Sequence, residues 1–391
     1  MRQIAVLRPA LSWLLAPSLL IVLTIAALPS AVAAPRSVAA SRGRSGAVYT
    51  MTNAAGGNEV IAYRRSTDGS LDEFGRYATG GEGTGRTRLS SQGPVTLSED
   101  GRWLFVANVG SDEISVFAVR RNKLRLVDVR PSGGRDPYSI TVYGDLVYVL
   151  NNAGGGNITG FRVRPQGRLD ALSGSTRPLS GAAVTDPAQV AFTPDGRSLV
   201  VTEKATDIID IYSVDGSGLT RGPRSVDVSD PDGTPVTPFG GDFTSRGQFI
   251  VTEAAAGEIG EAATSSYAVT RRSRLTTISD SVRDTRSEVC WTVVTPGDGY
   301  AFVTNFGDGT LSSYQVAADG SITLLDAVAA VTSPGELSVR DHGLSEDGRF
   351  LYAIDIHSQM VHGWRVGADG GLTEIGAFPG LPPTVAGLAA S

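Results

Sequence analysis

The chain is poor in cysteine and histidine. It has one cysteine, Cys290, among 391 residues. The three histidines are His342, His357 and His362. A single cysteine excludes an internal disulfide, so a hydrophobic core and strand pairing must supply the stability. Cys290 stands between Val289 and Trp291, and this apolar setting predicts a buried, unreactive thiol. No CxxC, HExxH or EF-hand pattern occurs, which excludes the metal sites that these motifs specify.

Basic residues are fewer than acidic ones. The formal net charge is −6 at neutral pH, with 34 Lys and Arg against 40 Asp and Glu. An acidic chain is a poor match for nucleic acid or for an anionic membrane surface, so neither is expected as a partner.

Long apolar runs are confined to the N-terminus. Arg2 and Arg8 precede an apolar stretch at residues 11–28, which ends in the small-residue pattern Ala31-Val32-Ala33. This arrangement predicts a secretory signal peptide at residues 1–33, followed by a flexible segment at residues 34–45. We therefore expect a secreted, periplasmic or cell-surface protein, without membrane association after cleavage.

Glycine and short apolar segments, by contrast, are abundant. The segments VTLSEDGRWLFVAN, VAFTPDGRSLVVTE and GLSEDGRFLYAID share one pattern, and related apolar segments recur about every 50 residues. Seven of these segments end at Asn53, Asn108, Asn152, Glu203, Glu253, Asn305 and Asp355. Each is followed by two more strand-like segments, and from the second repeat onward an inner strand precedes it.

Four strands in each of seven repeats predict an all-β fold. We expect a seven-bladed β-propeller over residues 46–391, with four antiparallel strands per blade. The first repeat lacks an inner strand, and the C-terminal LPPTVAGLAAS resembles QGPVTLSED of the second repeat. The C-terminal segment should therefore supply the missing strand and close the ring. A closed propeller is self-sufficient, so a monomer is expected.

The segments VYTMTN, LFVAN and AFVTN, with the SEDGR and TPDGR turns, resemble the lactonase family of seven-bladed propellers. This family includes bacterial 6-phosphogluconolactonases and fungal carboxymuconate lactonizing enzymes, and it overlaps the YVTN-repeat proteins. The resemblance implies lactone chemistry at the top of the central channel, using a histidine with arginine and acidic helpers. Gln189 stands where that histidine is expected, and glutamine is neither an acid nor a base near neutral pH.

The loops after the strand ends and the residues before the inner strands should meet at the channel mouth. The catalytic candidates there are Glu203, Glu253 and His357. The candidates for ligand binding are Gln189, Trp291, Asp341, Asp355, Asn108 and Asn305. Carboxylates gathered at one mouth can raise one another's pKa and yield a general base, or they can bind Ca²⁺. Alternatively, each carboxylate accepts hydrogen bonds from its own loop.

Two functions remain open from the sequence. The first is an exported hydrolase that opens a lactone or a similar cyclic ester. The alternative is a non-catalytic secreted propeller that binds a ligand or a protein partner, since one fold hosts many functions. Candidate side chains gathered in one pocket favour the enzyme, whereas side chains satisfied within their own loops favour the binding protein.

Overall fold

The computed structural model describes residues 45–391, apart from residues 122 and 271–272. The predicted signal peptide and residues 34–44 of the predicted flexible segment lie outside the described residues. The described part forms 29 strands and a single 3₁₀ turn, η1 (Ala255–Gly257). No helix in it has the length and apolar character needed to cross a membrane.

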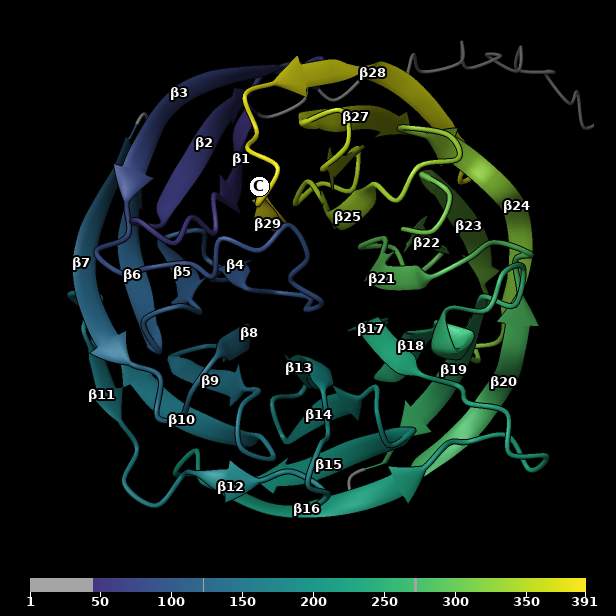
Figure 1. Cartoon of the computed structure of the whole chain (residues 1–391), viewed down its shortest axis with the longest axis horizontal. Helices are drawn as coiled ribbons and strands as arrows, with labels where there is room; N and C mark the ends of the chain where they lie inside the picture. The colour runs from purple at the N-terminus through teal and green to yellow at the C-terminus, as the bar shows by residue number, and fades with distance from the viewer. Residues whose placement is uncertain (1–44, 122, 271–272) are drawn as a thin grey trace, which may run out of the picture. The chain divides into compact units, whose positions relative to one another are not determined.

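The strands form seven antiparallel sheets, which stand as blades around a central axis (Figure 1). The innermost strands are β29 (Ala386–Ala390), β4 (Val95–Leu97), β8 (Pro137–Tyr143), β13 (Pro187–Phe192), β17 (Pro238–Phe243), β21 (Val289–Val294) and β25 (Val339–Leu344). The second strands are β1 (Gly46–Met51), β5 (Trp103–Asn108), β9 (Leu146–Asn151), β14 (Ser198–Glu203), β18 (Gln248–Glu253), β22 (Tyr300–Asn305) and β26 (Phe350–Asp355). Blades 1 to 7 are numbered in this order.

The outer half of each blade is built in the same way. The third strands are β2 (Glu59–Arg65), β6 (Glu113–Arg120), β10 (Asn157–Val163), β15 (Ile208–Val214), β19 (Ala263–Val269), β23 (Thr310–Val316) and β27 (Met360–Val366). The outermost strands are β3 (Leu71–Ala78), β7 (Lys123–Pro131), the pair β11 (Leu169–Ala171) and β12 (Arg177–Pro178), β16 (Thr220–Asp227), β20 (Leu275–Arg283), β24 (Ile322–Val331) and β28 (Leu372–Pro379). The seven-bladed fold predicted from the repeats is confirmed.

The C-terminal segment closes the ring. Strand β29 pairs antiparallel with β1, with Tyr49 opposite Ala389 and Val48 opposite Ala390. Blade 1 is thus assembled from both ends of the propeller, as predicted. Because β1 is paired on both sides, it has no free edge that could pair with a strand of another chain.

The second strand is the most buried element of each blade. All six residues of β5, β14 and β26 are buried. Tyrosines on the second and third strands also tie neighbouring blades together, because their hydroxyls donate to backbone oxygens across the blade interface. Tyr148 reaches Gly218 at 2.6 Å, and Tyr352 reaches Gly69 at 2.7 Å. Buried phenol groups are therefore hydrogen-bonded rather than left unpaired.

The Asp-Gly turns mark one face of the ring, called the bottom face here. In the first copy, Asp100 accepts hydrogen bonds from the Ser98 hydroxyl at 2.7 Å and from the Arg102 backbone at 3.0 Å. Gly101 then adopts φ +65°, a left-handed conformation that glycine tolerates without a Cβ penalty. The opposite face, where the second strands end, is called the top face.

Polar side chains on the inner strands bond the blades to one another around the channel. Gln189 accepts a hydrogen bond from the backbone of Gly241 at 2.6 Å. Asp242 accepts one from Val294 at 2.8 Å, again across a blade interface. Backbone groups at the sheet edges that line the channel thus find partners in the next blade.

Candidate functional site at the channel mouth

A cavity of about 530 Å³ opens on the top face. It is lined by residues of blades 4 to 7 and by Arg88 and Ser90, which lie in the connection between blades 1 and 2, within residues 86–92. We call this space the mouth cavity and residues 86–92 the crossing loop. A second cavity of about 470 Å³, the channel cavity, is lined by the inner strands down to the bottom-face turns.

A repeated backbone pairing builds the rim of the mouth cavity. In blades 3 to 7 the residue after the second strand donates its N–H to the residue before the inner strand, as Lys204 does to Asp186 at 3.2 Å and Phe306 to Glu288 at 3.0 Å. Asp186 and Glu288 have φ values of +42° and +47°, which non-glycine residues seldom adopt. This conformation is a marker of constrained sites, and all four of these residues line the cavity.

The crossing loop is tied to three blades. The buried guanidinium of Arg340, in blade 7, donates to the carbonyl oxygens of two loop residues. The ammonium of Lys204, in blade 4, donates to a third carbonyl oxygen at 3.1 Å. Gln92 bonds in both directions with the backbone of Thr292 in blade 6. The loop is therefore held by side-chain hydrogen bonds to blades 4, 6 and 7.

Lys204 is enclosed by oxygen acceptors. Its Nζ lies 3.2 Å from the Asp186 carboxylate, and it also donates to the carbonyl oxygen of Pro187 at 3.1 Å. The Phe239 ring lies below it, 5.1 Å from the ammonium to the ring centroid. Burial lowers the pKa of Lys204, and the nearby Asp186 opposes that shift. The ion pair is thus built into the wall of the cavity.

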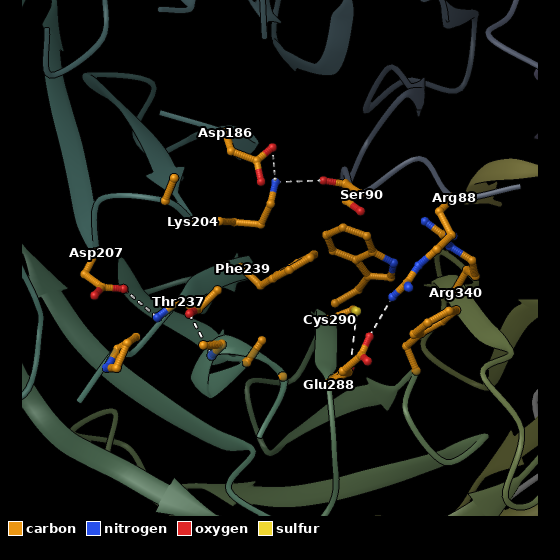
Figure 2. Close-up of a pocket in the computed structure, with 17 residues that line it drawn as sticks. Arg88, Ser90, Asp186, Lys204, Asp207, Thr237, Phe239, Glu288, Cys290 and Arg340 are labelled. Atoms are coloured by element: carbon orange, nitrogen blue, oxygen red, sulfur yellow. Dashed lines mark hydrogen bonds and ion pairs between the residues drawn. The ribbon is translucent and has the colours of Figure 1, made fainter. Parts of the chain in front are cut away.

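Arg88 and Glu288 form a second ion pair, which is more accessible (Figure 2). Arg88 Nη2 lies 2.6 Å from Glu288 Oε2, and the two side chains are 51% and 31% exposed. The Arg88 guanidinium lies 4.3 Å from the centroid of the Phe306 ring, which fixes its position by a cation–π contact. A carboxylate and a guanidinium therefore stand side by side at the opening.

Aromatic rings and a thiol complete the wall. Phe239 and Trp291 pack with their ring centroids 4.8 Å apart. The Cys290 Sγ donates to the Glu288 carbonyl oxygen at 3.3 Å, and burial raises the pKa of this thiol to about 12. Cys290 is therefore protonated near neutral pH and is no nucleophile.

The two predicted catalytic glutamates are hydrogen-bonded away from the mouth cavity. Glu203 is fully buried, and its carboxylate accepts bonds from the Ser180 N–H at 2.9 Å, the Ser180 hydroxyl at 2.7 Å and the Thr206 hydroxyl at 2.6 Å. Glu253 accepts a bond from the Ser281 hydroxyl at 2.7 Å, and burial raises its pKa to about 7. Neither lines the mouth cavity.

The other strand-end candidates behave in the same way. Asn108 and Asn305 donate to serine hydroxyls on the third strands of their own blades, at 2.7 and 2.8 Å. Asp355 accepts two backbone N–H bonds from the following turn, at 2.9 and 2.8 Å. Asn108 also accepts a bond from the Asn58 amide of blade 1 at 3.1 Å, and none of these three side chains lines the mouth cavity.

The remaining candidates are spread over three places. Trp291 lines the mouth cavity, whereas Gln189 and Asp341 line the channel cavity. His357 is exposed on the top face, with Nδ1 3.5 Å from Glu336, and lines neither cavity. The structure therefore does not bring Glu203, Glu253, Asp341 and His357 together.

Two residues that line the mouth cavity are offset by one position from predicted residues. Lys204 follows Glu203, and Phe306 follows Asn305. Because successive side chains of a strand alternate in direction, a residue that ends a strand inside the blade is followed by one that faces the channel mouth. The sequence predicts that successive strand residues alternate in direction, but it does not show which of them face the channel mouth.

The described residues offer no set of metal ligands. Among the described residues, no group of three or more His, Cys, Asp or Glu side chains could hold a metal ion. A Ca²⁺ ion at the acid-rich strand ends would need Glu203, Glu253 and Asp355 as ligands. These carboxylates instead accept hydrogen bonds from separate loops and strands. We derive no chemical step through a metal.

The fold and the cavity define the class: a seven-bladed propeller with a ligand-sized cavity at one end of its channel. The family model described as "Lactonase, 7-bladed beta-propeller" matches residues 30–185 and 244–386. The chain belongs to this family.

Similar solved structures share the fold at low sequence identity. A putative 6-phosphogluconolactonase from Bacteroides fragilis superposes with a TM-score of 0.66 at 19% identity, covering 89% of this chain and 98% of that one. The periplasmic gluconolactonase PpgL of Pseudomonas aeruginosa gives 0.67 at 17% identity, covering 89% and 99%. A Lactobacillus plantarum protein gives 0.71 at 16% identity, covering 89% and 100%.

Curated relatives match over a shorter stretch. An uncharacterized protein of Staphylococcus aureus strain USA300 is 30% identical over 128 residues, which is 32% of this chain and 36% of the relative. One from strain N315 is 32% identical over 129 residues. This chain thus matches about a third of the length of these relatives.

Proposed function

We propose that the protein hydrolyses a lactone in the mouth cavity. The observation that carries this proposal is the Arg88–Glu288 pair, which sets a basic carboxylate beside a cationic hydrogen-bond donor at the cavity opening. Membership of the lactonase family supports it. In this scheme the lactone ring lies in the cavity with its carbonyl oxygen toward Arg88.

The reaction needs a base and a group that stabilises negative charge. Glu288 takes a proton from a water molecule, whose oxygen attacks the carbonyl carbon. The carbonyl oxygen becomes an oxyanion, and Arg88 stabilises it through N–H donors that Glu288 does not use. The ring C–O bond then breaks, and Glu288 returns the proton to the leaving oxygen, which yields a hydroxy acid.

The other charged residues position this pair. Arg340 holds the crossing loop from which Arg88 projects, through bonds to the carbonyl oxygens of Thr87 and Leu89. Lys204 fixes Ser90 of the same loop and orients Asp186 on the opposite wall. Without these bonds Arg88 would lose the fixed geometry that oxyanion stabilisation requires.

Replacing Arg88 tests the scheme. In a pH-stat assay on sugar, aliphatic and muconolactone-type lactones, Arg88→Met should lower kcat about 100-fold or more on whichever lactone is turned over. Glu336→Gln is the matched surface control, because Glu336 lies outside the cavity and pairs only with His357. Turnover by Arg88→Met at the unaltered rate would refute the assignment.

The alternative is a protein that binds such a ligand without turning it over. None of the three histidines, all within the described residues, lines the mouth cavity, and Gln189 replaces the histidine that the family pattern suggests. No turnover across the panel, together with ligand-induced thermal stabilisation, would select this alternative.

We also propose that the protein is exported, on the basis of its N-terminal sequence. The charged start, the apolar stretch and the Ala31-Val32-Ala33 pattern support cleavage after Ala33. N-terminal sequencing of protein recovered outside the cytoplasm should begin at Ala34. Recovery of the intact N-terminus from the cytoplasm alone would contradict export.

A further inference from the structure

The charges of the mouth cavity balance. Its lining includes three cationic side chains, Arg88, Lys204 and Arg340. It also includes three carboxylates, Asp186, Asp207 and Glu288. Lys204 and Arg340 already donate to backbone carbonyl oxygens, and both are at least 92% buried, since their exposed fractions are 8% and 4%.

The equal numbers of cationic and carboxylate side chains restrict the kind of substrate that the cavity can bind. A phosphate or carboxylate group on the ligand needs charge-assisted donors that have no other partner. Arg88 is the one cation of the lining that is half exposed, and Glu288 already pairs with it. The cavity therefore offers no surplus of positive charge to an anionic lactone.

Apolar side chains line part of the cavity in blades 5 and 6. Phe239 and Trp291 supply aromatic faces. Ala254 and Ala256, in the loop that contains η1, and Pro235, which precedes β17, add apolar groups. An aromatic and aliphatic wall of this kind contributes binding energy through buried apolar area rather than through polar contacts.

Two strongly exposed hydrophobic side chains lie close in sequence to residues that line the cavity. The three most exposed large hydrophobic side chains of the described residues are Ile259, Val184 and Leu337, at 88%, 69% and 52%. Ile259 follows the cavity-lining Gly257 by two residues, and Val184 precedes the cavity-lining Asp186 by two. The other exposed large hydrophobics lie on the outer strands β7 and β24 and are 37–46% exposed. The two most exposed of these side chains, Ile259 and Val184, thus lie within two residues of cavity-lining positions in the sequence.

From these observations we propose that the substrate is an uncharged lactone with an apolar arm several carbons long. The lactone ring lies against Phe239 and Trp291, and the arm leaves the cavity over residues 254–260 toward Ile259. This inference rests on the proposed lactone hydrolysis and names the substrate class of the same site. A sugar lactone, with a hydroxyl on nearly every carbon, would leave its hydroxyl groups against the apolar wall.

A chain-length series tests the arm. For γ-lactones with unbranched side chains of zero to eight carbons, kcat/KM should rise about two- to fourfold for each methylene until the arm passes Ile259. Glucono-δ-lactone should be a poorer substrate than the longest-chain lactones. A flat series, or a preference for glucono-δ-lactone, would overturn the proposal.

Ile259→Asp tests where the arm lies. This variant should flatten the chain-length dependence while leaving turnover of unsubstituted γ-butyrolactone within about twofold. Val328→Asp is the matched control, because Val328 is 40% exposed on β24, away from the cavity, and should keep the wild-type slope. Equal slopes in both variants would refute this path for the arm.

Binding of unreactive lactams separates this proposal from the proposed hydrolysis. Calorimetry with alkyl-substituted γ-lactams should show affinity that rises with chain length, whether or not lactones are turned over. If lactams bind in this way but no lactone is hydrolysed, the catalytic scheme fails and the ligand class stands. If affinity does not rise with chain length, the ligand class fails, even where hydrolysis is observed.

Discussion

Arg88 and Lys204 are both cations of the mouth cavity, yet they are held in opposite ways. Lys204 is 8% exposed and is surrounded by Asp186 and two carbonyl oxygens, so a ligand cannot reach its donors without displacing a partner. Arg88 is half exposed and shares only part of its guanidinium with Glu288. Exposure therefore decides which cation acts on a ligand and which one shapes the wall.

Replacing Glu203 distinguishes a structural role of this residue from a catalytic one. Glu203→Gln replaces one of the two buried acceptor oxygens that serve Ser180 and Thr206 with an NH2 donor, so the free energy of unfolding should fall by about 1–2 kcal/mol in urea titration. Lactone turnover per folded molecule should stay within about twofold. A loss of turnover above 100-fold with unchanged stability would instead support the catalytic role that the sequence suggested.

At the level of elements, the sequence predicted the strands well because each repeat is a local pattern. The Asp-Gly turns, the buried second strands and the closing strand β29 all follow from alternation and turn chemistry. The side chains that line the mouth were less predictable. The direction of Glu203 depends on the register of β14 against β13 and β15, which a shift of one residue reverses.

The position of the crossing loop could not be predicted from residues that are close to it in the sequence. Its bonds to Lys204 and Arg340 join residues 114 and 251 positions apart in the chain. Arg88 gains its place in the site only through those long-range bonds. Nothing in the sequence around Arg88 indicates which blade it will face.

Gly83 anchors the connection that leads into the crossing loop. Its N–H donates to the Ala54 carbonyl oxygen at 2.8 Å, and an added Cβ would overlap the backbone of Asn53. Gly83→Ala should therefore lower the free energy of unfolding by about 2 kcal/mol, measured by urea titration.

Gly216→Ala is the control for this substitution. A Cβ at Gly216 meets nothing within 4 Å, so the stability should change by less than about 0.5 kcal/mol. Equal stability of the two variants would show that the backbone of Gly83 does not pack against Asn53 as described.

At the level of the whole molecule, buried carboxyls connect the blades and make the stability depend on pH. Burial raises the pKa of Asp242, Asp284 and Asp341 to about 6 and that of Glu253 to about 7. In the unfolded chain such groups titrate near pH 4. The folded state thus binds more protons than the unfolded state between about pH 4 and pH 7.

The protein should therefore be more stable at pH 6 than at pH 8. A carboxyl whose pKa is raised by folding contributes its stability at low pH and loses it as the pH rises through the folded-state value, here about 6 to 7. The combined gain should be about 2 kcal/mol or more, visible as a higher Tm in calorimetry. His342, whose pKa burial lowers to about 4, opposes the trend below about pH 6.5.

Asp242→Asn provides the control for the pH effect. An amide oxygen can still accept the hydrogen bond from Val294, but it does not titrate. This variant should show a smaller rise in Tm between pH 8 and pH 6 than the wild type. An unchanged or larger rise would contradict the assignment of part of the effect to Asp242.

In the proposed reaction, Glu288 activates water for lactone opening at the channel mouth. The most direct test is the pH-stat rate of lactone hydrolysis by the wild type and by Glu288→Gln, at equal concentrations of folded protein. Loss of general-base catalysis should reduce kcat by about 100-fold or more, with the Tm nearly unchanged. Equal rates would show that the reaction, if it occurs, does not use this carboxylate.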